Sequence, residues 1–154
     1  MKFDRAAVLA TLPQQPPFLF VDEAEIEGDI VRATYEVRGD ESCLEGHFKG
    51  NPVFPASIVF EALGQAACLW VLKEGAARLG MPVASGEVFF ASMDGAHFYR
   101  MIKPGDVLEM EQKLKRLRAP LAVFQGSVKV RGERACQVDQ LMLAFGGQVK
   151  PPGA

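Results

Sequence analysis

The stretch GHFKGNPVFPASIVFEALGQAA, residues 46–67, decides the fold. From Ser57 onward the chain reads SIVFEALGQAACLWVL, an apolar run that predicts a helix buried on nearly all sides. Its strong hydrogen-bonding side chains, Ser57, Glu61 and Gln65, are spaced four apart and therefore share one helix face. A buried carboxylate costs free energy unless it is paired or protonated, so burial is expected to raise the pKa of Glu61.

One of the two histidines, His47, lies in the irregular segment 38–55 just before this helix. Glycines flank it on both sides and two prolines follow it, which fixes the loop and lets its backbone approach a ligand closely. A histidine on a rigid loop, near a buried acid, is a candidate general base. Structural pairing of Glu61 with a cation, and structural hydrogen bonding of His47, remain the alternatives.

The remaining pattern predicts an α+β fold. A short helix over residues 3–12 precedes two extended runs, residues 18–26 and 30–37, around a turn at residues 27–29, which predict a hairpin. The apolar helix is expected to have Pro55 in its first turn and to stop near Gly80. Further strand candidates occupy residues 87–95, 96–102, 107–117, 121–130 and 134–145. One apolar helix and one antiparallel sheet must cover each other, and the tail from Gly146 is expected to fray.

Composition narrows the class of protein. The chain has 154 residues, of which 49% are hydrophobic, and a formal net charge of −2. That balance gives no reason to expect nucleic acid as a partner. The three cysteines are scattered, so neither disulfides nor a metal site are expected, and no glycine-rich phosphate loop suggests a cofactor.

The chain start and the apolar run bear on the compartment. Asp4 and Arg5 stand where a signal peptide would need an apolar stretch. Glu61 and Gln65 interrupt the longest apolar run, which we expect to be too short to cross a membrane. We therefore expect a soluble, cytoplasmic domain with no membrane partner.

The stretch GHFKGNPVFPASIVFEALGQAA resembles the active-site segment of the hot-dog-fold 3-hydroxyacyl-[acyl-carrier-protein] dehydratases of fatty-acid synthesis. Their pattern is, in outline, G-H-F-P-G-x-P-V-M-P-G, then an apolar stretch and E-A-x-x-Q. The likeness continues in PFLFVDEAEIE, MDGAHFYRMIKPGD and ERACQVDQLMLAF. It implies one hot-dog domain over residues 1–154 with a core of about 17–145, in which a sheet wraps a single helix.

The resemblance also implies an activity. It implies removal of water from a (3R)-3-hydroxyacyl thioester, carried by acyl carrier protein or coenzyme A, in fatty-acid or related lipid or polyketide synthesis. His47 and Glu61 would be the catalytic pair, contributed by different chains of a homodimer or a larger homo-oligomer. The Ala56 N–H would hold the thioester oxygen. Glutamate at position 61 favours plain dehydration, because the branch that also isomerises the double bond usually has aspartate there.

The other expected substrate contacts come from the helix and the strand after it. Gln65 would orient the carboxyl group of Glu61, and Ser57 would cap the helix or line the site. An acyl tunnel could be lined by four side chains that could equally be plain core: Phe60, Leu63, Phe89 and Phe90. Three residues depart from the family pattern and leave the substrate open: Lys49, Ala56 and His97.

Other functions remain open from the sequence. A hot-dog acyl thioesterase and a non-catalytic acyl-binding protein both suit the same pocket. Cys43 could be imagined as a nucleophile, but no orienting group is evident. The basic run KLKRLR, residues 113–118, could dock an acidic carrier protein, although a solvated strand edge explains it more simply.

Overall fold

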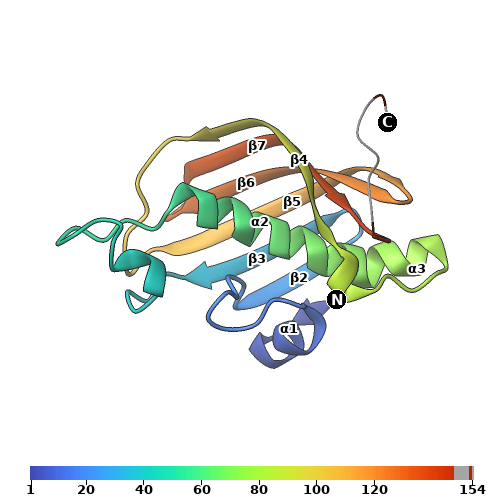
Figure 1. Ribbon diagram of the computed structural model, residues 1–154, viewed down its shortest axis with the longest axis horizontal. Coiled ribbons are helices and arrows are strands. Elements are labelled where there is room, and N and C mark those ends of the chain that lie inside the picture. The colour runs from blue at the N-terminus through green and yellow to red at the C-terminus, as the bar shows by residue number, and fades with distance from the viewer. Residues whose placement is uncertain (148–152, 154) are drawn as a thin grey trace.

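A long helix lies across one face of an antiparallel sheet (Figure 1). The computed structural model describes residues 1–147 and 153. The prediction that the tail frays concerns residues that lie mostly outside the described ones. The α+β class predicted from the sequence, one central helix wrapped by an antiparallel sheet, is confirmed.

Seven strands form the sheet, in the order β1-β2-β3-β5-β6-β7-β4, and every neighbouring pair is antiparallel. The strands are β1 (Lys2–Phe3), β2 (Glu23–Glu27), β3 (Ile30–Glu36), β4 (Phe89–Phe98), β5 (Val107–Arg118), β6 (Leu121–Val130) and β7 (Glu133–Ala144). Burial alternates along β2, β3 and the first half of β5. One face of the sheet is therefore covered by the helix, and the other faces solvent.

The central helix runs for 24 residues, Ala56–Leu79. Its parts are α2 (Ala56–Trp70), a π-helical turn (Val71–Gly75) and α3 (Ala76–Leu79). Pro55 precedes the first helical residue instead of lying in the first turn, and no side chain caps the helix there. The helix ends as predicted at Gly80, whose φ of 65° lies in the left-handed region that glycine adopts without strain.

The expectation that this helix is too short to span a membrane is wrong by length and composition alone. However, 61% of its most apolar window is buried inside the protein. It packs against β3, β5, β6 and β7. Burial against the sheet accounts for its apolar sequence, as for the core helix of a soluble protein.

Two buried polar contacts fix the helix against the sheet and its first hairpin. Trp70 Nε1 donates to the carbonyl of Gly28 at 2.9 Å, in the turn between β2 and β3. The fully buried Gln112 of β5 donates from Nε2 to the carbonyl of Leu63 at 3.0 Å. Burial of Leu63 and similar side chains contributes about 1.5–3 kcal/mol each. The polar contacts then set the position of the helix, because buried donors require specific partners.

Most predicted boundaries hold, including the short helix α1 (Arg5–Thr11), which Asp4 caps by accepting from Ala7 N at 2.9 Å. The first hairpin strand begins later than predicted. Residues 18–22 lie outside β2, and the N–H of Phe20 donates to the side chain of Gln65 on α2 instead. A strand pattern of period two cannot predict this contact, because it depends on a side chain of a distant helix.

The two strands expected at residues 87–95 and 96–102 are replaced by one strand, β4 (Phe89–Phe98), and residues 99–102 lie outside it. Its register against β7 shifts between Phe90 and Ser92, a β-bulge, and Gly95 has a φ of 61°. Gly95, the last residue of the first predicted strand, lies inside one strand whose pairing continues to Phe98.

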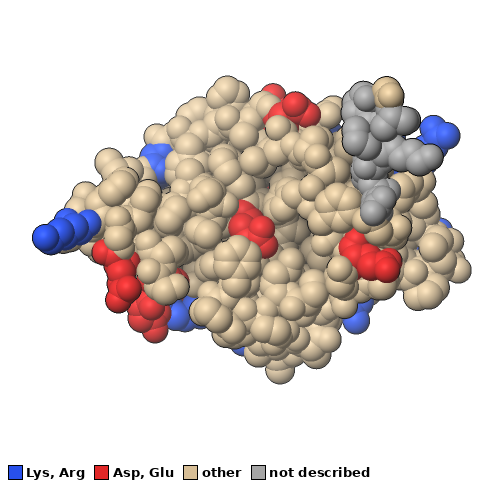
Figure 2. All heavy atoms as spheres, viewed as in Figure 1, with Lys and Arg blue, Asp and Glu red and all other residues tan. Residues whose placement is uncertain are grey.

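Strand β4 is an edge of the sheet and is exposed along most of its length. It pairs only with β7, while Phe89, Phe90 and Met93 are 39%, 38% and 37% exposed. Figure 2 shows that the face of the molecule over α2 and β4 carries few charges. An exposed apolar edge strand is a surface suited to association.

Candidate active site

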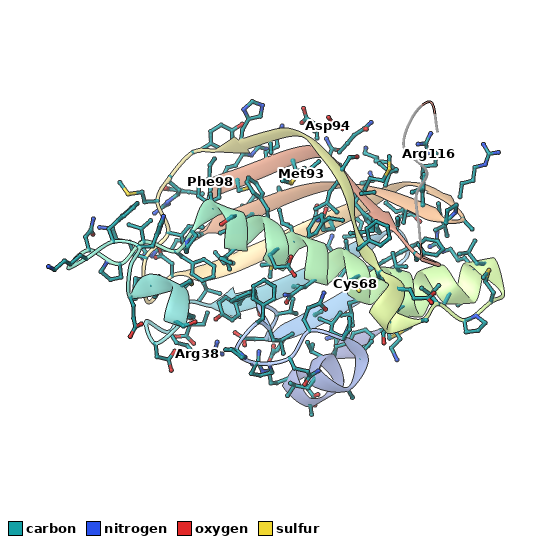
Figure 3. All side chains as sticks on the ribbon, viewed as in Figure 1. Arg38, Cys68, Met93, Asp94, Phe98 and Arg116 are labelled. Atoms are coloured by element: carbon teal, nitrogen blue, oxygen red, sulfur yellow. The ribbon has the colours of Figure 1, made fainter. Side chains whose placement is uncertain are left out.

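Glu61 lies in a pocket of about 360 Å³ between α2 and β4. The helix contributes Ser57, Phe60 and Glu61, and the strand contributes Phe90, Ala91, Ser92 and Met93. Figure 3 shows Met93 and Phe98 between β4 and the helix, and Phe98 packs edge-on against Phe60. The volume is at the lower end of the roughly 300–1,000 Å³ typical of ligand pockets. The structure thus brings together three of the expected site residues.

Burial raises the pKa of Glu61 above its ordinary value, and a hydrogen bond from Gln65 offsets part of this rise. No cationic side chain pairs with Glu61 among the described residues. The structural ion pair that the sequence left open is therefore not formed within the chain. A carboxyl group in this setting keeps its proton to a higher pH than in water and can act as an acid.

Gln65 lies one turn beyond Glu61 and is completely buried, outside the pocket itself. Its Nε2 donates to Glu61 Oε1 at 3.0 Å and to the carbonyl of Phe18 at 3.1 Å. Its Oε1 accepts from the N–H of Phe20 at 2.8 Å. These backbone partners fix the orientation of the amide, so Gln65 can only donate toward Glu61.

The start of α2 presents free backbone donors about 7.5 Å along the helix axis from Glu61, at 1.5 Å per residue. The N–H groups of Ala56 and Ser57 have no acceptor among the described residues. Ser57 is exposed and lines the pocket, and its side chain does not cap the helix. Free N–H groups and the helix dipole make this end a favourable place for an oxygen that gains negative charge.

The backbone carbonyl and the backbone N–H of Val53 both contact His47 and hold it in a tight loop. Its Nδ1 lies 2.6 Å from the carbonyl of Val53, and its own carbonyl accepts from Val53 N at 2.8 Å. Because a carbonyl only accepts, Nδ1 carries the proton and Nε2 has the free lone pair in the neutral ring. The ring stacks on Phe48 with centroids 4.0 Å apart. Nε2 is therefore the atom of His47 that can take a proton.

Within one chain, His47 does not line the pocket that contains Glu61. The single chain therefore brings Glu61, Ser57 and Phe60 together, places Ala56 at the adjoining helix end, and leaves His47 on a separate loop. Of the tunnel residues expected from the sequence, Phe60 and Phe90 line the pocket, whereas Leu63 is fully buried core and Phe89 lies outside.

The departures from the family pattern fall at exposed positions. Lys49 lies at the tip of a turn closed by two hydrogen bonds between Phe48 and Asn51, so the loop is held without a proline there. His97 is exposed on β4, where it stacks with Tyr99.

Burial raises the pKa of Cys43, which makes its thiolate, the form a nucleophile needs, less accessible.

A larger hollow, of about 650 Å³, lies elsewhere, on the outer face of the sheet. Two of the cations that line it are paired with acids that also line it, Arg32 with Glu111 at 3.0 Å and Lys2 with Glu25 at 3.8 Å. No group of three or more His, Cys, Asp or Glu side chains suited to a metal ion occurs among the described residues. The apolar pocket with a half-buried acid of raised pKa is the better candidate site, despite its smaller volume.

Sequence reasoning missed several residues of the site. Ala91, Ser92 and Met93 line the pocket next to a β-bulge in β4, and Val53 orients His47 through backbone atoms. Neither effect has a side-chain signature in the sequence. The one available signal was the aromatic pair FF at residues 89–90, in an exposed strand where a polar side chain would be expected on one face.

Comparison with known proteins identifies the family. Residues 12–139 match the FabA-like domain family. The chain belongs to this family. Its curated relatives include the FabZ 3-hydroxyacyl-[acyl-carrier-protein] dehydratase of Chloroflexus aggregans, 37% identical over 87% of this chain and 90% of the relative. The FabZ of Enterococcus faecalis is 34% identical over 90% and 96%. The dehydratase family predicted from the His47 to Glu61 segment is thus confirmed.

Solved structures support the FabA-like fold. A dehydratase heterocomplex, ApeI:P from Xenorhabdus doucetiae, matches with a TM-score of 0.76 at 15% identity, over 92% of this chain and 91% of the other. A hypothetical thioesterase with coenzyme A from Streptococcus pneumoniae matches with a TM-score of 0.59 at 15% identity, over 82% and 87%. At these identities the matches establish the hot-dog fold, which serves both proteins.

Proposed function

We propose that the protein removes water from a (3R)-3-hydroxyacyl thioester to give the trans-2-enoyl thioester in fatty-acid or related lipid synthesis. The observation that carries this proposal is the Glu61 carboxyl group. It is half-buried without a cation, has a raised pKa, and is oriented by Gln65 in an apolar pocket beside the free end of α2. The names of the curated FabZ relatives support the same reaction.

His47 and Glu61 divide the proton transfers. His47 Nε2 takes the C2 proton, and the electrons of the C–H bond move toward the thioester carbonyl. The N–H groups of Ala56 and Ser57, with the helix dipole, stabilise the negative oxygen that forms. The C3–O bond then breaks as Glu61 gives its proton to the departing hydroxyl, which leaves as water. Because Gln65 donates to Oε1, the transferred proton sits on Oε2.

We propose that two copies of the chain complete each site. Glu61 lies in a pocket that its own His47 does not reach, and the adjacent edge strand β4 exposes apolar side chains. A second copy paired along β4 would cover those side chains and, in the arrangement the family implies, bring its His47 opposite Glu61. The assembly is then a homodimer, or a larger oligomer built from such dimers, with sites shared between chains.

The substrate carrier is either acyl carrier protein or coenzyme A. The curated relatives carry acyl carrier protein in their names, which favours the protein carrier. We propose the cytoplasm as the compartment, since all three cysteines are free and Cys68 and Cys136 are buried. Neither a metal nor a redox cofactor has a part in this chemistry.

A thioesterase is the second candidate, because Glu61 could activate water against the carbonyl and a similar fold occurs in a hypothetical thioesterase. It would release free thiol from an acyl thioester. A non-catalytic acyl-binding protein would bind the thioester without any turnover. The curated relatives, which are named as dehydratases, favour dehydration over both. A carboxyl group held by Gln65 without a cation also suits proton donation to a leaving hydroxyl.

The deciding assay adds the protein to a trans-2-enoyl thioester and follows the enoyl absorbance as water adds across the double bond. The reverse reaction must use the same acid and base, so loss of absorbance that requires both His47 and Glu61 supports the proposal. Release of free thiol without loss of the double bond would replace dehydration by hydrolysis.

A further inference from the structure

Gly64 stands in the middle of α2, where glycine is the poorest helix former after proline. It is buried in a helix that otherwise favours alanine and leucine. A glycine retained at such a position needs a reason in packing or function. The reason here is the ring of Phe90, which lies directly over it.

The Phe90 ring fills the space where a side chain at position 64 would stand. A Cβ atom built on Gly64 would overlap the edge of the ring, and the three nearest atoms all belong to Phe90. The register of β4 shifts directly after Phe90, a β-bulge of the kind that re-aims side chains beside active sites. Phe90 is nevertheless 38% exposed, so much of the ring is not enclosed by the chain.

This contact lies at one end of the Glu61 pocket. Ser57, Phe60 and Glu61 line the pocket along one face of α2, and Gly64 is the next position on that face. At 1.5 Å per residue, Gly64 is only about 4.5 Å of helix rise beyond Glu61. A chain extending from the acid along the helix therefore meets the Phe90 ring almost at once.

We infer that Phe90, seated over Gly64, is a specificity-determining residue that closes the far end of the pocket and limits the acyl chain to a few carbons. This rests on the proposed function insofar as the pocket receives the acyl chain of a thioester. Gly64 is required for this arrangement, because only glycine lets the Phe90 ring approach the helix so closely. The wild-type pocket therefore favours short acyl chains.

Binding of unreactive saturated acyl-pantetheine thioesters tests the inference without requiring turnover. Calorimetric affinities are measured for chains of four to fourteen carbons. In the wild type, affinity stops rising at a short length. In Phe90→Ala it continues to rise, by about fourfold for each methylene newly buried. In Gly64→Ala the displaced ring enters the pocket, so affinity stops rising at a shorter length than in the wild type.

Three further variants make the result specific. Phe90→Ala combined with Gly64→Ala should behave as Phe90→Ala, because the added methyl group no longer meets a ring. Phe90→Leu should lengthen the accepted chain less than Phe90→Ala, and serves if the alanine variant fails to fold. Phe89→Ala is the matched control, since Phe89 is equally exposed on β4 but does not line the pocket, and should leave the length dependence unchanged.

The same length dependence in the wild type and both Phe90 variants would overturn the inference, as would an equal shift in Phe89→Ala. Absence of binding at every length in the wild type would also overturn it. Enoyl hydration measured in parallel separates the two proposals. If the length limit depends on Phe90 but no hydration occurs, the dehydratase proposal fails and the length-limit inference stands. If hydration occurs without that limit, the dehydratase proposal stands and the length-limit inference fails.

Discussion

Gln65 Nε2 lies 3.0 Å from Glu61 Oε1, while the backbone of residues 18 and 20 occupies the other hydrogen-bonding positions of the same amide. The amide cannot turn over without losing both backbone bonds. Gln65 therefore always presents an N–H to Glu61, and the carboxyl group offers its other oxygen to the pocket. A segment far away in sequence thus holds the acid in place.

Gln65→Met should lower kcat and shift the alkaline limb of the pH–rate profile to higher pH. The hydrogen bond from Gln65 lowers the pKa of Glu61, so its loss lets burial raise that pKa further. The variant should also lose about 1–3 kcal/mol of stability for each buried backbone group left unpaired. The pH–rate profile of the purified variant provides the measurement.

Gln112→Met is the control for that experiment. Gln112 is also fully buried and also bonds to α2, through the carbonyl of Leu63, but does not touch Glu61. It should lose stability while the pH–rate profile keeps its position. An equal shift of the profile in both variants would mean that Gln65 acts only through stability.

His47→Ala and Glu61→Gln should each reduce kcat/KM by at least about 10², the lower end of the range for a general acid or base. Mixed together, the two inactive variants should recover activity. In a dimer with one chain of each kind, one of the two sites is intact, so isolated mixed dimers should have about half of wild-type activity. Activity of co-expressed chains, purified through two different tags, measures this.

No recovery from a mixture that forms mixed dimers would place His47 and Glu61 of one site in the same chain. Conversely, a monomer by sedimentation that still hydrates enoyl thioesters would remove the shared-site arrangement altogether. Neither outcome would affect the proposed reaction, which depends on the two residues and not on which chain supplies each.

Activity in the hydroxyacyl-to-enoyl direction should fall as pH rises through the raised pKa of Glu61, because the acid must be protonated to release water. Substitution of Gln65, the neighbour of Glu61, tests whether Glu61 is the group that titrates in the alkaline limb. If the alkaline limb belongs to Glu61, Gln65→Met moves it; an alkaline limb indifferent to Gln65 belongs to another group. Rates of dehydration across the pH range supply the test.

Glu61 also makes stability depend on pH. Its pKa is 4.5 ordinarily and higher in the folded protein, so the folded state binds this proton more tightly. The resulting stabilisation is complete below pH 4.5 and is lost as pH rises through the folded pKa. Relative to Glu61→Gln, which does not titrate, the wild type should become less stable between pH 4 and pH 7. Urea unfolding at both pH values measures this, and an unchanged difference would mean that Glu61 is not buried in solution.

Gly80→Ala should destabilise the protein by about 1–2 kcal/mol, the cost of a left-handed conformation for a residue with a Cβ. Gly80 ends the central helix far along the chain from the site, so kcat/KM should stay at the wild-type value. Thermal unfolding and the enoyl assay together check this. A stability equal to that of the wild type would mean that the helix ends differently.

The sequence alone determined the class of fold and the acid. An apolar run with three polar residues four apart can only be a buried helix with a polar stripe, and local periodicity also gave the ends of α1, the central helix and the later strands. It could not show that residues 18–22 leave the hairpin for Gln65, or that residues 89–98 form one strand, because both depend on contacts between distant segments.

Only the tertiary structure decided which atoms act and how far the pocket extends. Val53 selects Nε2 of His47 through a backbone carbonyl, and Phe90 meets Gly64 only because β4 crosses to the far edge of the sheet and bulges there. The separation of His47 from the Glu61 pocket is likewise a fact of three dimensions. Sequence patterns record which faces are apolar; long-range pairing sets which side chains and backbone atoms come within bonding distance.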